Sequence, residues 1–225
     1  MAFAACGGDD GGTGIAAECN PLGGQACLVP WPSSAFLTED ATTETGFRLD
    51  LATAGMPMNI DSLPVDPAFF NRFDGFAPSA PIIVGFASGV SGANLPHPDR
   101  PDESLAADSP IVLLDMDRME RAPFFAEIDQ NVSDPLQRAV IIRPLIRLKP
   151  STRYAVALRR SLKAADGADL VSPNAFTAVR DGTAYEHPRL QRGRFDAVFA
   201  ALAPAGVAKE DLVLAWDVVT ASDEF

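Results

Sequence analysis

The sequence predicts a mainly β fold, a β-sandwich with a short helix before it and one amphipathic helix near the C-terminus. Two observations lead to this fold class. Between residues 81 and 159, short apolar runs are separated by turn residues at the spacing typical of a sandwich. Helical periodicity is clear only later, in residues 187–202.

Each predicted strand is a short apolar run bounded by residues that favour turns. The runs are 81–86, 111–114, 124–128, 139–143 and 153–159. In the last of these, apolar residues alternate with others, so Tyr154, Val156 and Leu158 are expected on one face. Asp166 and Gly167 then predict a tight turn.

Two helical segments flank these strands. Residues 67–73 predict one or two helical turns, with Asp66 as the N-cap and Pro67 at the first helical position. Residues 187–202 predict an amphipathic helix, and Gly206 lies just past its end, where a helix stop belongs. The apolar face of this helix consists of Leu190, Phe195, Val198, Phe199 and Leu202. Residues 211–217 predict a final strand, and we expect its Trp216 to pack in the core, together with Trp31 and most of the phenylalanines.

Composition and charge exclude some classes of function. The chain has 225 residues, of which 47% are hydrophobic, enough for one large domain or one domain plus a tail. Its formal charge is −12, which disfavours nucleic-acid binding because a polyanion would be repelled. The longest uncharged stretch, residues 75–98, is interrupted by several prolines and glycines and does not predict a membrane-spanning helix.

The first ten residues resemble the lipobox of bacterial lipoproteins, with Phe3-Ala-Ala-Cys6 as the processing site. The resemblance implies that Cys6 is lipidated after export and anchors the protein to the outer membrane or cell surface. Residues 1–18 would then form a lipobox-like start and a flexible Gly/Asp tether. Because no Lys or Arg precedes Cys6, a signal sequence is expected upstream of Met1. The alternative is a disordered tail with an incidental cysteine.

The other two cysteines, Cys19 and Cys27, enclose a turn-rich segment. We expect a disulfide between them, because export makes oxidation plausible and a metal site would need further ligands nearby. The disulfide would staple the segment 19–62, which begins as extended chain. Prolines in residues 28–36 exclude a regular helix and favour extended chain over a sheet edge.

Three segments together resemble a known family. They are Leu63–Pro81, with its Asp74-Gly-Phe76 and Ser79-Ala-Pro81 elements, Ile142–Leu158, and Asp211–Ser222. In pattern and order they resemble the N-terminal Ig-like domain of the bacterial virulence-factor lipase family, whose members are surface lysophospholipases and esterases. The middle segment also resembles bacterial Ig-like domains in general.

This resemblance implies an organisation in which an Ig-like β-sandwich precedes an α/β-hydrolase domain that carries the serine nucleophile. Residues 63–186 would form the sandwich, and residues 187–225 would form a helix and a last strand that lead to a downstream domain missing from this chain. No catalytic residue of the family can be placed on this sequence.

A direct search for hydrolytic chemistry gives weak candidates. Residues 89–93 approach a nucleophile elbow around Ser91, but alanine replaces the final glycine and no helix follows; residues 85–89 have the wrong spacing. His97 and His187 are the only histidines, and both are expected to be surface residues. We therefore predict no catalytic residues in this chain.

Metal, cofactor and anion sites are also not predicted. Asp115 and Asp117 could bind calcium, but they lack the remaining residues of an EF-hand loop, and an ordinary acidic turn is favoured. The glycines at 11–14 lack the lysine of a phosphate-binding loop. A basic stretch is expected to be a solvated edge, with docking of anionic lipid headgroups as the alternative. Its members are Arg143, Arg147, Lys149, Arg153, Arg159 and Arg160.

Two functions remain. The first is a non-catalytic accessory domain of an exported lipoprotein hydrolase of the lipase or esterase type, which positions a downstream hydrolase domain. The second is a stand-alone surface module for binding or adhesion, with loops displayed on an Ig-like scaffold. A small enzyme in its own right would need an active site that the sequence does not supply.

Overall fold

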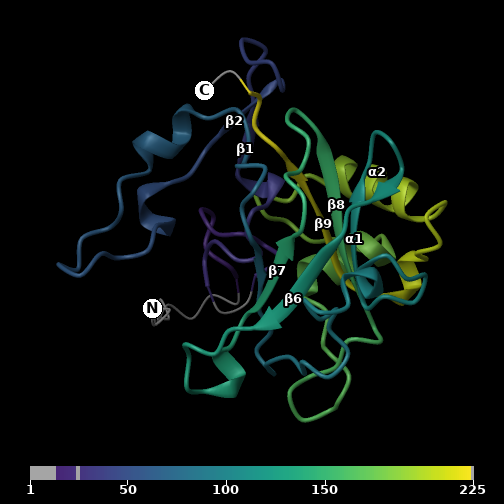
Figure 1. The fold of residues 1–225 in the computed structure, drawn as a ribbon. Helices are drawn as coiled ribbons and strands as arrows, with labels where there is room; N and C mark the ends of the chain where they lie inside the picture. Colours follow the sequence, from purple (N-terminus) through teal and green to yellow (C-terminus); the bar gives the residue numbers. More distant parts are fainter. Residues whose placement is uncertain (1–13, 24–25, 224–225) are drawn as a thin grey trace.

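A computed structural model describes residues 14–23 and 26–223 (Figure 1). Within them the chain forms three antiparallel sheets: β1-β2, β3-β7-β6 and β5-β4-β8-β9. The strands are β1 (Leu37–Glu39), β2 (Phe47–Leu49), β3 (Ile82–Val84), β4 (Ile111–Asp115), β5 (Glu120–Arg121), β6 (Phe124–Ile128), β7 (Val140–Pro144), β8 (Arg153–Arg159) and β9 (Leu212–Val219). The prediction of a mainly β protein is confirmed, and every predicted strand is present within a few residues of its expected bounds.

Two α-helices and six short 3-10 helices complete the described part of the chain. The α-helices are α1 (Asn174–Asp181) and α2 (Arg192–Leu202), and the 3-10 helices are η1 (Ser34–Phe36), η2 (Thr53–Gly55), η3 (Pro67–Arg72), η4 (Pro101–Ser104), η5 (Pro135–Gln137) and η6 (Lys209–Asp211). The helical turns expected at 67–73 are confirmed as η3, in which the Asp66 side chain accepts a hydrogen bond from Ala68 N. The turn at Gly167 is also confirmed, with a φ of +87°.

The helix expected over 187–202 begins only at Arg192. The preceding residues form a loop in which Leu190 N donates to the carbonyl of His187. Helix α1 was missed by the sequence reasoning, although its apolar residues Ala175, Phe176, Ala178 and Val179 recur at helical spacing. Its boundaries do carry signals, since Pro173 precedes it and Gly182 ends it with a φ of +74°.

Three strands of the four-stranded sheet, β4, β8 and β9, are buried on both faces. All eight residues of β9 and all five of β4 are buried, as are the five inner residues of β8. The second face is covered because α2 packs against β8 and β9 and also contacts α1, where the rings of Phe176 and Phe199 lie 6.2 Å apart. The alternation in residues 153–159 therefore separates two buried faces, and not a buried face from a solvent-exposed one.

The segment that precedes β1 joins the two larger sheets. Trp31 exchanges backbone hydrogen bonds with Ile83 on β3, so extended chain does lie along a sheet edge, as predicted. One residue further on, the carbonyl of Pro32 accepts a hydrogen bond of 2.8 Å from Trp216 Nε1 on β9. Trp216 is 1% exposed, which confirms the prediction that it is a core residue, whereas Trp31 is only partly buried.

Residues 52–73, which we call the arm, link β2 to β3 and carry η2 and η3. In Figure 1 this blue segment extends away from the larger sheets. Its two ends are joined, since Leu49 N donates to the carbonyl of Phe73 and the Asn71 side chain bonds both backbone groups of Leu51. Phe69 and Phe70 on η3 are exposed, and they are exceptions among the described phenylalanines, most of which lie in the core or against it as expected.

Candidate functional site

The three sequence segments that carry the family resemblance meet at the end of β9, around Thr220. The Thr220 hydroxyl donates to the carbonyl of Lys149 at 2.6 Å and accepts from Thr152 N at 3.0 Å. Thr220 N also donates to the carbonyl of Thr152 at 3.0 Å. Thr220 is 1% exposed, so these bonds lie in a water-poor environment, where breaking one leaves a polar group unpaired.

The other side of the β9 end is held by Asp74, Gly75 and Phe76. Phe76 N donates to the carbonyl of Val219 at 2.9 Å, and the Phe76 carbonyl accepts from Ala221 N at 2.8 Å. The Asp74 carboxylate, 1% exposed, accepts from Ser222 N at 3.0 Å. These bonds form a parallel bridge between residues that are more than 140 positions apart.

Gly75 is required at this crossing because the two backbones approach closely. A Cβ added at Gly75 would lie 2.6 Å from Ala221 N and 2.7 Å from the carbonyl carbon of Thr220. These distances are shorter than any ordinary carbon contact, so no other residue fits without a shift of the backbone. We call Asp74, Gly75, Phe76, Thr152 and Thr220 the exit clamp.

Beyond the exit clamp the chain remains held. Ser151 N donates to the carbonyl of Ala221 at 3.1 Å, and Arg147 forms an ion pair with Asp223. The backbone is thus bonded on two sides from Val219 to Ser222. Sequence reasoning named these segments for their family resemblance but gave no signal that they meet, because the contacts join distant parts of the chain.

The basic stretch is largely neutralised by carboxylates. Arg143 pairs with Glu127 at 2.6 Å across β6 and β7, and Arg153 pairs with Asp217 at 2.7 Å across β8 and β9. Arg194 on α2 joins the same Asp217 carboxylate at 3.2 Å. Arg153 is only 27% exposed, so the expectation of a solvated edge is wrong for this residue. Arg159 and Arg160 instead donate to the backbone carbonyls of Gly206 and Glu210, so positive charge outside carboxylate pairs is confined to these two residues of the stretch.

The carboxylate of Asp115 stabilises the turn between β4 and β5. This carboxylate is 4% exposed, accepts from the backbone N–H groups of Asp117 and Arg118 at 3.0 Å each, and pairs with Lys149 Nζ at 2.8 Å. Burial by itself would raise the pKa of Asp115, but the hydrogen bonds from Lys149 and these backbone groups outweigh it and lower the pKa below its ordinary value. The arrangement matches the acidic turn favoured by the sequence.

We expect Asp115 to make stability depend on pH. Because its folded-state pKa is lowered, its contribution is present above the unfolded pKa and is lost as the pH falls below about 4. Lys149→Met should lower the free energy of unfolding at neutral pH by about 1–2 kcal/mol, discounted because Lys149 is partly exposed, and should flatten the acid dependence. Urea unfolding from acidic to neutral pH measures both the loss of stability and its pH dependence.

Lys163→Met, which removes an exposed ion pair with Asp169, is the control, and it should change the free energy of unfolding little. Equal effects of the two variants would contradict the role of Asp115.

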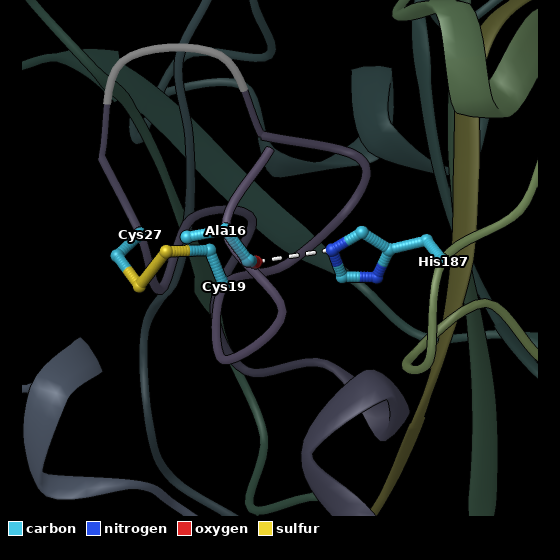
Figure 2. Close-up of a disulfide and its surroundings, with 4 residues drawn as sticks. All are labelled: Ala16, Cys19, Cys27 and His187. Carbon is cyan, nitrogen blue, oxygen red and sulfur yellow. Dashed lines mark hydrogen bonds between the residues drawn. A yellow bond between two sulfur atoms is a disulfide. The ribbon is translucent and has the colours of Figure 1, made fainter. Parts of the chain in front are cut away.

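The candidate nucleophile and bases lie in separate structural settings. Ser91 is in a loop, where its hydroxyl accepts from Ala93 N and its backbone N–H donates to the carbonyl of Lys163. His97 is exposed and lies 3.4 Å from Asp99. His187 is half-buried, and its Nε2 lies 3.1 Å from the carbonyl oxygen of Ala16 (Figure 2). His187 thus tethers the first described residues to the loop before α2.

The predicted disulfide is present between Cys19 and Cys27, whose Cα atoms are 4.4 Å apart (Figure 2). It supports the arm, because a Cβ at Gly55 in η2 would lie 3.0 Å from the sulfur of Cys27 and 3.6 Å from Glu18. Cys6, the predicted lipidation site, lies outside the described residues. Among the described residues, no group of three or more His, Cys, Asp and Glu side chains could hold a metal ion.

Loss of this disulfide is expected to weaken both the fold and the arm. Replacing both cysteines by serine should lower the free energy of unfolding by about 2.5 kcal/mol, from the chain entropy of a closed loop of this length. Limited proteolysis should also become faster near Gly55, since η2 would lose its rigid neighbour. Urea unfolding and mapping of cleavage sites test the two effects. An arm that is cleaved no faster than in the unmodified protein would show that the disulfide does not support it.

No helix in the part of the chain that the structure describes is long and apolar enough to cross a membrane. The sequence matches no model of a known protein family, and it matches no curated protein.

Proposed function

We propose that this chain is a non-catalytic N-terminal accessory domain of an exported bacterial lipoprotein hydrolase of the lipase or esterase type. In this proposal it positions a downstream α/β-hydrolase domain. The observation that carries the proposal is the exit clamp, which bonds the backbone on two sides up to Ser222. A strand held in this way fixes the direction in which following residues leave the domain.

A fixed exit matters for a domain whose role is positioning. A flexible linker lets two domains sample many orientations, whereas a strand bonded to its last residues restricts them. The exit clamp is built from the three segments that carry the lipase-family resemblance. All three segments contribute hydrogen bonds around Thr220. This arrangement is expected if the segments act together to fix the direction of the chain after β9.

An Ig-like sandwich is supported by the strand counts of the two larger sheets. Four antiparallel strands in one and three in the other are the numbers of a constant-type Ig domain. Export is supported by the bond between Cys19 and Cys27, because disulfides persist in oxidising compartments. We further propose that Cys6 is lipidated and attaches the protein to the bacterial outer membrane or cell surface.

The coding frame on both sides of this sequence tests the proposal. We expect a signal sequence upstream of Met1, and downstream of Phe225 a domain with a Gly-x-Ser-x-Gly elbow between a strand and a helix. In the protein with that domain, small-angle X-ray scattering should fit one fixed arrangement, and Thr220→Val should broaden it. A stop codon directly after Phe225 would refute the accessory-domain proposal.

The second candidate, a stand-alone surface module for binding or adhesion, is favoured by a different observation. The arm displays exposed aromatic and aliphatic side chains away from the larger sheets, as a recognition loop on a scaffold would. This candidate requires a stop codon after Phe225 and stable folding of the chain alone. Cooperative unfolding of the isolated chain together with such a stop codon would select it.

A further inference from the structure

The outer part of the arm is a narrow ribbon with an ordered tip. Val65 N donates to the carbonyl of Pro57 at 3.0 Å, and Asn59 N donates to the carbonyl of Leu63 at 2.8 Å. The Asn59 side-chain oxygen accepts from Asp61 N at 2.9 Å and from Leu63 N at 3.0 Å. The turn is thus held by its own hydrogen bonds, although it lies in solvent, and its side chains are displayed in a fixed arrangement.

The tip displays apolar side chains. Ile60 is fully exposed, Met58 is 61% exposed and Leu63 is 59% exposed. Of the eleven large exposed hydrophobic residues in the described part of the chain, five lie on the arm: these three together with Phe69 and Phe70. Such clustering marks a contact surface, whereas apolar residues scattered singly over a protein surface need no explanation.

The charge of the arm indicates what it can contact. The charged residues of the arm are Asp61, Asp66 and Arg72, and the guanidinium of Arg72 lies 4.9 Å from the centre of the Phe69 ring on η3. Without Lys or Arg the tip has no attraction for anionic headgroups or nucleic acid. Residues that dominate protein–protein interfaces, namely Trp, Tyr and Arg, are also absent from the tip, whose large side chains are Met58, Ile60 and Leu63. This chemistry suits the acyl region of a neutral membrane.

The base of the arm lies beside the start of the described chain. Gly55 contacts the disulfide at Cys27, and the described residues begin at Gly14, only five positions before Cys19. Eight positions separate Cys6 from Gly14, a span of at most about 28 Å when fully extended. A lipid on Cys6 would therefore keep Gly14 within about 28 Å of the membrane, on the part of the domain where the arm begins.

We propose that Met58, Ile60 and Leu63 insert into a neutral phospholipid membrane and supply a second point of attachment. The inference rests on the membrane attachment in the proposed function. It adds that the arm, and not the basic stretch, contacts the bilayer. Insertion at the tip would also restrict how the domain can turn on its tether, because two separated contacts define an orientation.

The test uses the full chain with Cys6→Ser, so that no acyl chain contributes, and vesicles of pure phosphatidylcholine. After sedimentation with excess vesicles, the protein should be found in the vesicle pellet. Ile60→Ser should weaken this partitioning by roughly tenfold, the lower end of what burial of one large aliphatic side chain contributes. Val171→Ser is the matched control, since Val171 is 79% exposed but lies away from the arm, and it should partition like the unmodified chain.

Two further measurements sharpen the test. Raising the salt concentration should not release the protein, because no charge attracts it to the vesicle. In Ile60→Trp, brominated phosphatidylcholine should quench the added fluorescence relative to the parent chain, whose Trp216 is buried and whose Trp31 packs partly buried against the core. Both readouts are independent of catalysis and of any downstream domain.

The proposal is overturned if the chain does not sediment with excess vesicles, or if Ile60→Ser and Val171→Ser bind equally. Self-association of the chain that Ile60→Ser abolishes, without vesicle binding, would assign the tip to a second copy instead. A stop codon after Phe225 would refute the accessory-domain role but leave this result unaffected, so the two failures are distinguishable.

Discussion

Replacing Gly75 with alanine is expected to lower the free energy of unfolding by about 3 kcal/mol and to release the end of β9. The added Cβ would lie 2.6 Å from Ala221 N, so the backbone of residues 74–76 or of 220–222 must move. Such a move breaks the parallel bridge with Thr220 and its neighbouring bonds. Urea unfolding measures the loss of stability, and amide hydrogen exchange at Ala221 and Ser222 measures the release.

Gly85→Ala is the matched control for this substitution. Gly85 comes directly after β3, and nothing lies within 4 Å of the position that its Cβ would occupy. We expect its stability to change by no more than about 0.5 kcal/mol. Protected amides at Ala221 and Ser222 in Gly75→Ala would contradict the exit clamp, because the crossing would then tolerate a side chain.

The second large effect is expected at Trp216. Trp216→Ala should lower the free energy of unfolding by about 3–5 kcal/mol, because it removes one of the largest fully buried side chains and leaves the carbonyl of buried Pro32 without its donor. Trp216→Phe keeps most of the apolar contact and should cost about 1–2 kcal/mol. Thermal and urea unfolding of the three proteins test this order.

The comparison between the two Trp216 variants separates packing from the hydrogen bond. If phenylalanine is as damaging as alanine, the bond to Pro32 dominates; if both cost less than about 1 kcal/mol, the segment before β1 is not anchored by β9. That segment also carries Trp31, which bonds to Ile83 on β3. Trp216→Ala should therefore loosen the connection between the two larger sheets, which hydrogen exchange at Trp31 would detect.

Local features of the sequence predicted the main strands, one 3-10 helix, the disulfide and the burial of Trp216. Apolar runs bounded by turn residues predicted the strands, because side-chain periodicity and turn propensity act over a few residues. Asp66 and Pro67 predicted the start of η3 from local capping preferences. Two cysteines eight positions apart predicted the disulfide. The Trp216 prediction succeeded because a large ring inside an apolar run has few alternatives to burial.

Only the tertiary structure decided which faces are covered and which distant segments meet. The alternation in β8 did not reveal that α2 would cover its second face, because that depends on the path of the chain after Arg159. Ile60 and Phe69 look like core residues in the sequence but lie on the exposed arm. The need for glycine at position 75 arises only where its backbone crosses Thr220 and Ala221, a contact between segments that no local pattern connects.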